Sequence, residues 1–77
     1  MGKTLYNYTG LTEPGLKRLK RLVACGERGL GWRALYAGWF GLRHTFESQC
    51  YVTHKGDRRV ATDRAREVVA QYGWLVP

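Results

Sequence analysis

The chain has 77 residues, and its 13 Lys and Arg against six Asp and Glu give a formal net charge of +7. This length leaves room for one domain, residues 1–77, and the ten Trp, Tyr and Phe residues exclude a disordered chain because they can build a compact core. The excess charge predicts a polyanionic partner. Nine of the 13 cations are Arg, which can grip a phosphate through two hydrogen bonds.

The cysteines and histidines show no spacing typical of a metal site. Cys25 and Cys50 form no CxxC motif, and His44 and His54 do not complete a zinc-binding pattern. We therefore expect two free thiols and no metal or other cofactor. Residues 1–6 lack the apolar run of a signal peptide, and no segment reaches transmembrane length. We expect a cytoplasmic protein without a membrane partner.

A short strand and then a long helix are expected at the start of the chain. Residues 4–8 alternate and carry aromatic side chains, which favours a strand. Thr12 is a suitable N-cap for a helix over residues 12–25, and Gly26 is a suitable stop. The apolar stripe of this helix consists of Leu16, Leu19, Leu22 and Val23.

The polar side of this helix carries an unbalanced positive charge. Lys17 and Arg21 lie one turn apart, and Arg28 follows the helix. A charged helical face is often only solvated. Here two Glu residues offset five cations between positions 13 and 28, so we interpret the face as a phosphate-facing surface.

Residues 29–41 combine helical spacing with four glycines. Each interior Gly weakens a helix by about 1 kcal/mol relative to Ala. We predict a short aromatic-rich helix here, and strand structure over residues 30–41 remains the alternative. We interpret its large side chains as core residues in preference to a surface for stacking bases. The helical spacing is carried by Trp32, Leu35, Tyr36, Trp39 and Phe40.

The last part of the chain predicts a strand followed by a second long helix. Residues 43–52 alternate, with Phe46 and Val52 on the expected core face. Thr53 is then predicted to cap a helix that ends at Gly73 and is followed by a short apolar tail. The apolar stripe of that helix consists of Ala61, Ala65, Val68, Val69 and Tyr72.

Residues 51–61 carry an apolar residue, a Thr, two variable residues, a Gly and a basic residue in that order. This pattern resembles the junction between the wing and the last helix in bacterial winged-helix DNA-binding proteins. The resemblance implies a helix-turn-helix earlier in the chain, and Ala34 and Gly38 have the spacing of its buried Ala and turn Gly. The later positions that should be apolar are His44 and Glu47, so another small α+β arrangement remains open.

These observations predict a small single α+β domain, winged-helix-like, with two main helices and a short aromatic-rich helix packed on a small antiparallel sheet. We expect a regulatory protein that binds nucleic acid, DNA in preference to RNA, chiefly through its phosphates. No His lies at a suggestive spacing from a Ser or Cys, so we expect no enzymatic activity. The candidate contacts are Lys17, Arg21, Arg28, Arg33, Arg43, Lys55, Arg58 and Arg59.

A second hypothesis belongs to another class of protein. The chain could be a small inhibitor or adaptor, such as a phage-encoded anti-defence (anti-CRISPR-like) protein, that docks on an acidic surface of a larger partner. Tyr, Trp and Arg are also enriched at protein interfaces, so composition alone does not separate the two hypotheses. The orientation of the aromatic side chains separates the two hypotheses. Burial of all of them favours nucleic acid, whereas a surface patch made of several favours a protein partner.

Overall fold

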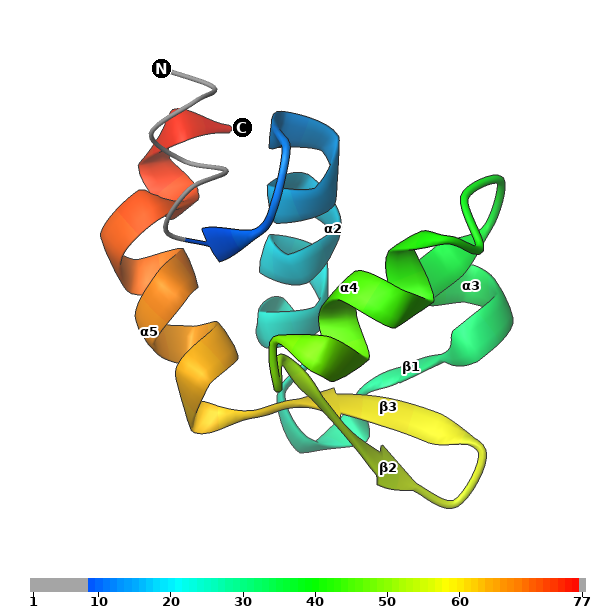
Figure 1. The fold of residues 1–77 in the computed structure, drawn as a ribbon. Coiled ribbons are helices and arrows are strands. Elements are labelled where there is room, and N and C mark those ends of the chain that lie inside the picture. Colours follow the sequence, from blue (N-terminus) through cyan, green and yellow to red (C-terminus); the bar gives the residue numbers. More distant parts are fainter. Residues whose placement is uncertain (1–8, 77) are drawn as a thin grey trace.

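The computed structural model describes residues 9–76, which form an α+β domain of four α-helices and a three-stranded antiparallel sheet (Figure 1). The strand predicted over residues 4–8 lies outside the described residues. The helices are α2 (Glu13–Ala24), α3 (Trp32–Tyr36), α4 (Leu42–Ser48) and α5 (Asp63–Tyr72), and the strands are β1 (Leu30–Gly31), β2 (Val52–Lys55) and β3 (Arg58–Ala61). Two 3₁₀ turns, η1 (Gly26–Arg28) and η2 (Gly73–Leu75), follow α2 and α5.

Helix α2 confirms the first predicted helix. Leu16, Leu19 and Leu22 are fully buried along one face, as the apolar stripe indicated. Gly26 follows the C-cap with a φ of +58°, a left-handed conformation that glycine adopts without steric cost. Thr12 occupies the N-cap position, but its side chain makes no capping hydrogen bond, so the helix is held mainly by its buried face.

Helix α3 confirms a short helix in the glycine-rich segment, but it covers only part of the predicted apolar stripe. The helix ends at Tyr36, and Gly38 then adopts a φ of +75°. Tyr36 is fully buried, whereas Trp39 and Phe40 lie beyond the helix and are 38% and 59% exposed. The interpretation of these last two residues as core was therefore wrong, because the chain leaves the helical path before it reaches them.

The strand predicted over residues 43–52 is wrong in its first half, because residues 42–48 form α4. Leu42 and Phe46 are four residues apart, and a helix buries both on one face. Ser48, which the alternating pattern placed beside Phe46 on a core face, is exposed. The true strand, β2, begins only at Val52.

A β-hairpin occupies the segment that was predicted to begin the second long helix. Strands β2 and β3 pair in register, with Val52 opposite Ala61 and Lys55 opposite Arg58. Gly56 is the first residue of the two-residue loop between them and has a φ of +63°, as a tight hairpin turn requires at that position. The hairpin therefore begins where a helical N-terminus was expected.

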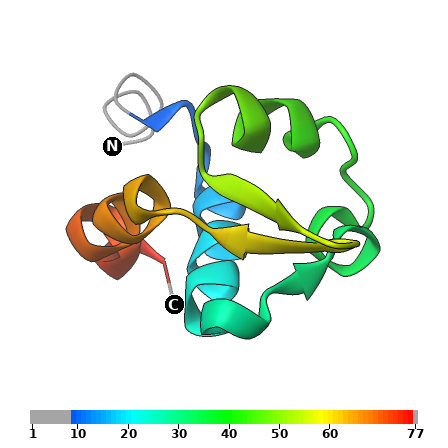
Figure 2. The same ribbon diagram turned by 90° about the horizontal axis from the view of Figure 1, so that it is seen from below.

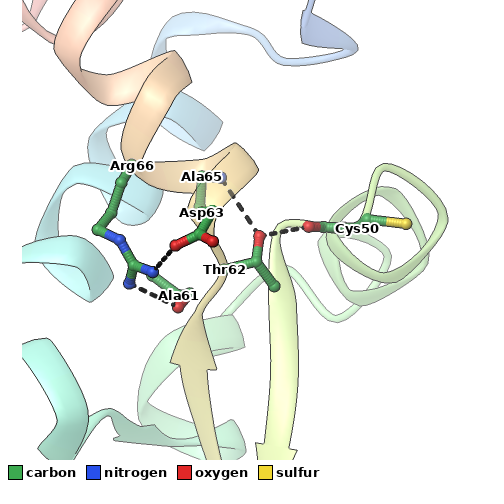
Figure 3. A network of polar contacts seen from close by, with 6 residues as sticks. All are labelled: Cys50, Ala61, Thr62, Asp63, Ala65 and Arg66. Carbon is green, nitrogen blue, oxygen red and sulfur yellow. Dashed lines mark hydrogen bonds and ion pairs between the residues drawn. The ribbon is translucent and has the colours of Figure 1, made fainter.

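Helix α5 is capped by Thr62 and not by Thr53. The Thr62 hydroxyl accepts a hydrogen bond from the Ala65 amide at 3.3 Å and donates one to the Cys50 carbonyl (Figure 3). This side chain therefore caps the helix and also joins it to the turn that precedes β2. In the same first turn of the helix, an ion pair between Asp63 and Arg66 lies at the surface.

The core lies between α2, α5 and the sheet. Helices α2 and α5 lie side by side, and the sheet runs across their lower ends in Figure 1. Seen from below, α4 lies on one side of the hairpin and β1 on the other (Figure 2). The buried side chains that meet there come from all these elements and include Leu16, Leu19, Leu22, Tyr36, Phe46, Tyr51, Ala61, Ala65 and Val68.

Two smaller expectations are also tested by the described residues. Cys25 and Cys50 are free thiols, as predicted. Within residues 9–76, no helix has both the length and the apolar character needed to cross a bilayer.

Candidate nucleic-acid interface

The exposed candidate contacts fall into two groups on the surface. One group comes from α4 and the β2–β3 hairpin and consists of Arg43, Lys55 and Arg58. The other comes from α2 and η1 and consists of Lys17, Arg21 and Arg28. Arg33 is exposed on α3, which lies between α2 and α4 in the sequence.

The tip of the hairpin concentrates positive charge. Lys55 and Arg58 are directly opposite each other in the register, so their side chains leave the same face of the sheet. Both are exposed, and neither makes an ion pair with a described residue. Like charges at opposed positions destabilise a hairpin, and a bound anion would relieve that repulsion.

Glu47 connects α4 to the hairpin. Its Oε1 accepts a hydrogen bond from Arg43 Nε at 3.1 Å and lies 3.6 Å from His54 Nε2 on β2. The hydrogen bond from Arg43, followed by the positive charges around it, lowers the pKa of the Glu47 carboxyl below its usual value. Sequence analysis missed this cluster. Arg43 and Glu47 have the (i, i+4) spacing of a helical ion pair, but the segment had been interpreted as a strand.

Arg59 does not belong to the exposed surface, and its assignment as a phosphate contact is corrected. It is 8% exposed and lies in β3, opposite Leu30 on one side and His54 on the other. Its Nε is buried without a hydrogen-bond partner among the described residues. The two-residue periodicity of β3 turns Arg58 outward and Arg59 inward. The helix predicted for these residues gave no indication that Arg58 and Arg59 point to opposite faces.

The Tyr36 hydroxyl is also buried in this region without a hydrogen-bond partner among the described residues. Burial raises the pKa of Tyr36, and the negative charge of Glu47 raises it further, whereas the positive charges of Arg59 and Arg43 lower it. The phenol therefore stays neutral in the folded protein at neutral pH.

The cations of α2 line a groove of their own. Lys17, Arg18 and Arg21 form one wall, and the α3 segment contributes Ala34, Leu35 and Ala37 to the other. Arg18 donates a hydrogen bond from Nη1 to the Leu35 carbonyl at 3.0 Å, which ties α2 to α3. The Lys20 side chain points away from this groove. Its Nζ donates hydrogen bonds to the carbonyl oxygens of Gly73, in η2, and of Val76.

The aromatic side chains are not all buried, and several of them form a surface patch, which by the criterion given above favours a protein partner. Tyr36 is buried. Trp39 and Phe40 are exposed, and the ring of Phe40 packs against Trp32 with 6.1 Å between centroids. The Arg33 guanidinium lies over the Trp32 ring at 5.2 Å. A small aromatic surface beside α4 therefore accompanies the positive charge.

Comparisons with protein-family models, with curated proteins and with solved structures find no match to this chain. The described residues also contain no group of three His, Cys, Asp or Glu side chains that could hold a metal ion. The contacts and charges of α4 and the hairpin are therefore the basis for the functional proposal.

Proposed function

We propose that this chain is a small cytoplasmic winged-helix protein that binds DNA and serves a regulatory role, with α4 as its recognition helix and the β2–β3 hairpin as its wing. The order of elements supports the proposal. The order along the chain is α2, β1, α3, α4 and then the two strands of the hairpin, as in winged-helix domains. The strand order in the sheet is β1-β3-β2. This support is an analogy of fold, and function needs support from the site itself.

The observation that carries the proposal is the exposed positive charge of α4 and of the hairpin, at Arg43, Lys55 and Arg58. Arg43 lies on α4, and the other two lie at the tip of the hairpin. Glu47 and His54 bring the helix and the hairpin together, and Lys55 and Arg58 lie at the tip of that hairpin, on the sheet face opposite to His54. Residues 51–61, whose pattern resembled the exit from a wing, contain the whole hairpin.

The helical form of α4 favours duplex DNA over duplex RNA. The major groove of B-form DNA is wide enough to admit an α-helix, and each base pair shows a distinct pattern of donors and acceptors there. The corresponding groove of A-form RNA is deep and narrow and does not admit side chains. The exposed polar residues of α4 include Arg43, His44 and Ser48, which suit a groove lined by such groups.

A salt titration of binding to labelled duplex DNA tests the proposal. If Arg33, Lys55 and Arg58 each meet a phosphate, the slope of log affinity against log salt is about −3. Replacing Lys55 and Arg58 together by Gln flattens that slope by about two units. The matched control replaces Lys17 and Arg21 by Gln, which removes the same charge from α2, and its effect is expected to be smaller.

Two outcomes count against this proposal. Absence of binding at low salt removes DNA as the partner. An equal loss of slope in the two double variants shows that net charge alone drives binding, and that α4 and the hairpin are not a dedicated interface.

The exposure of Trp39 and Phe40 favours a second candidate function, docking on an acidic surface of a larger protein. An inhibitor or an anti-defence adaptor would use these side chains as aromatic anchors and its Arg and Lys side chains around them. A pull-down from nuclease-treated host lysate, with the wild type beside a Trp39→Ala, Phe40→Ala variant, tests it. A protein partner that survives nuclease and is lost with the variant supports docking. A partner that disappears with nuclease contradicts it.

A further inference from the structure

Arg43 is an exposed cation whose side chain is held in one direction by a hydrogen bond. It is the second residue of α4, and its side chain is 56% exposed. Its Nε donates to Glu47 Oε1 at 3.1 Å, and neither of its terminal nitrogens makes a hydrogen bond to a described residue. One edge of the guanidinium is therefore held by the protein, while the terminal amino groups remain available for a ligand.

The carboxylate that holds Arg43 is itself held from the other side. His54 on β2 lies 3.6 Å from the same oxygen of Glu47, and the Glu47 side chain is 36% exposed. An isolated ion pair on a helix surface fixes little, because two long side chains move freely in water. Here three side chains from a helix and a strand form one network, which restricts the direction in which Arg43 points.

We propose that Arg43 is a specificity-determining residue that reads one guanine in the major groove, and that Glu47 is the positioning residue that orients it. This inference rests on the proposed DNA-binding function. Two parallel N–H donors match the O6 and N7 acceptors of guanine, and no other base presents that pair of acceptors in the major groove. Residues near the N-terminus of a recognition helix are those that reach base edges, and Arg43 has that position in α4.

The roles of Arg43, Lys55 and Arg58 then differ. Lys55 and Arg58 at the hairpin tip contact phosphates and contribute affinity for any sequence. Arg43 contributes the difference in affinity between sequences. A Lys at its position would keep the charge but lose the planar pair of donors.

The experiment first selects preferred duplexes from a randomised DNA pool with the wild-type protein. Each guanine of the preferred site is then replaced in turn, either by adenine or by 7-deazaguanine, which pairs normally but lacks the N7 acceptor. Replacement of a G·C pair by A·T at one position is expected to lower affinity roughly 5- to 150-fold, and 7-deazaguanine at the same position to account for part of that loss. The Arg43→Ala variant, which has no side-chain donor, is expected to bind the guanine and 7-deazaguanine duplexes equally.

Two further variants test the positioning role of Glu47. Glu47→Ala is expected to lower the affinity ratio between the two duplexes, and Glu47→Gln to restore part of it, because Gln retains an oxygen that can accept from Arg43 Nε. If Glu47 served only stability, both variants would lower the melting temperature and leave the ratio unchanged. Arg66→Ala on α5 makes the same chemical change as Arg43→Ala away from α4 and the hairpin, and should leave the ratio unchanged.

The outcomes separate this inference from the function on which it rests. Duplex binding without base preference, or a preference that persists in Arg43→Ala, overturns the guanine assignment and leaves the DNA-binding proposal in place. Absence of duplex binding at low salt overturns both.

Discussion

Tyr36 and Tyr51 are both fully buried, and they differ in the surroundings of the hydroxyl group. Both rings pack edge-on against Phe46, with centroid distances of 5.8 Å and 6.2 Å, and burial raises the pKa of both phenols. The Tyr51 hydroxyl donates a hydrogen bond to the Thr9 carbonyl, whereas the Tyr36 hydroxyl has no partner among the described residues. A buried polar group without a partner costs about 1–3 kcal/mol. The two hydroxyls should therefore affect stability in opposite directions.

We expect Tyr36→Phe to be neutral or to raise the free energy of unfolding by about 1 kcal/mol, because it removes an unsatisfied group and keeps the ring. Tyr51→Phe, the matched control, removes a buried hydrogen bond and should lower that free energy by about 1 kcal/mol. Urea denaturation of the two variants and the wild type measures both changes. A clear loss of stability in Tyr36→Phe would mean that its hydroxyl has a partner.

At the scale of elements, α5 depends on one side chain for its start. Thr62 accepts from the Ala65 amide and donates to the Cys50 carbonyl, so its hydroxyl serves the helix and the turn before β2 at once. Thr12 at the start of α2 makes no such bond. Thr53, once expected to be a cap, is exposed on β2.

These three threonines make a matched set for substitution by alanine. Thr62→Ala is expected to lower the free energy of unfolding by about 1–2 kcal/mol, because a capping bond and a second hydrogen bond are lost together. Thr12→Ala and Thr53→Ala should each change it by less than about 0.5 kcal/mol. Thermal unfolding followed by circular dichroism compares them. A larger effect at Thr12 than at Thr62 would contradict the assignment of the cap.

The sequence predicted α2 well, since a stripe of four apolar residues and a terminal Gly all indicate the same helix. It failed for α4, because residues 43–52 alternate by coincidence while Leu42, just outside that window, completes a helical pair with Phe46. The Gly56-Asp57 turn was not recognised, so the hairpin was taken for a helix. The inward direction of Arg59 depends on hairpin register, and no local pattern of charges specifies register.

At the scale of the whole molecule, stability depends on a small core. A chain of 77 residues is expected to be stable by roughly 4–12 kcal/mol. Leu19 is completely buried between α2 and its neighbours, whereas Trp39, on the turn between α3 and α4, is 38% exposed. Trp39 therefore contributes less to this core than the smaller Leu19 does.

Leu19→Ala should lower the free energy of unfolding by about 2–5 kcal/mol and leave the domain largely unfolded at moderate temperature. Trp39→Ala is expected to cost on the order of 1 kcal/mol and to leave a folded domain. Near-ultraviolet circular dichroism and thermal melts distinguish the two variants. Unfolding of Trp39→Ala would return Trp39 to the core and weaken the case for an aromatic docking surface.

The strand order β1-β3-β2 has a consequence for how copies of the chain behave at high concentration. Among the described residues, β3 lies between its partners, so β1 and β2 carry the open edges of the sheet. An open edge can recruit a strand from another molecule and start aggregation. Here β1 has only two residues, and β2 ends in Lys55. A Lys on an edge strand disfavours pairing with a strand of another molecule, so Lys55, proposed to contact a phosphate, also lowers the tendency of two copies to join along β2.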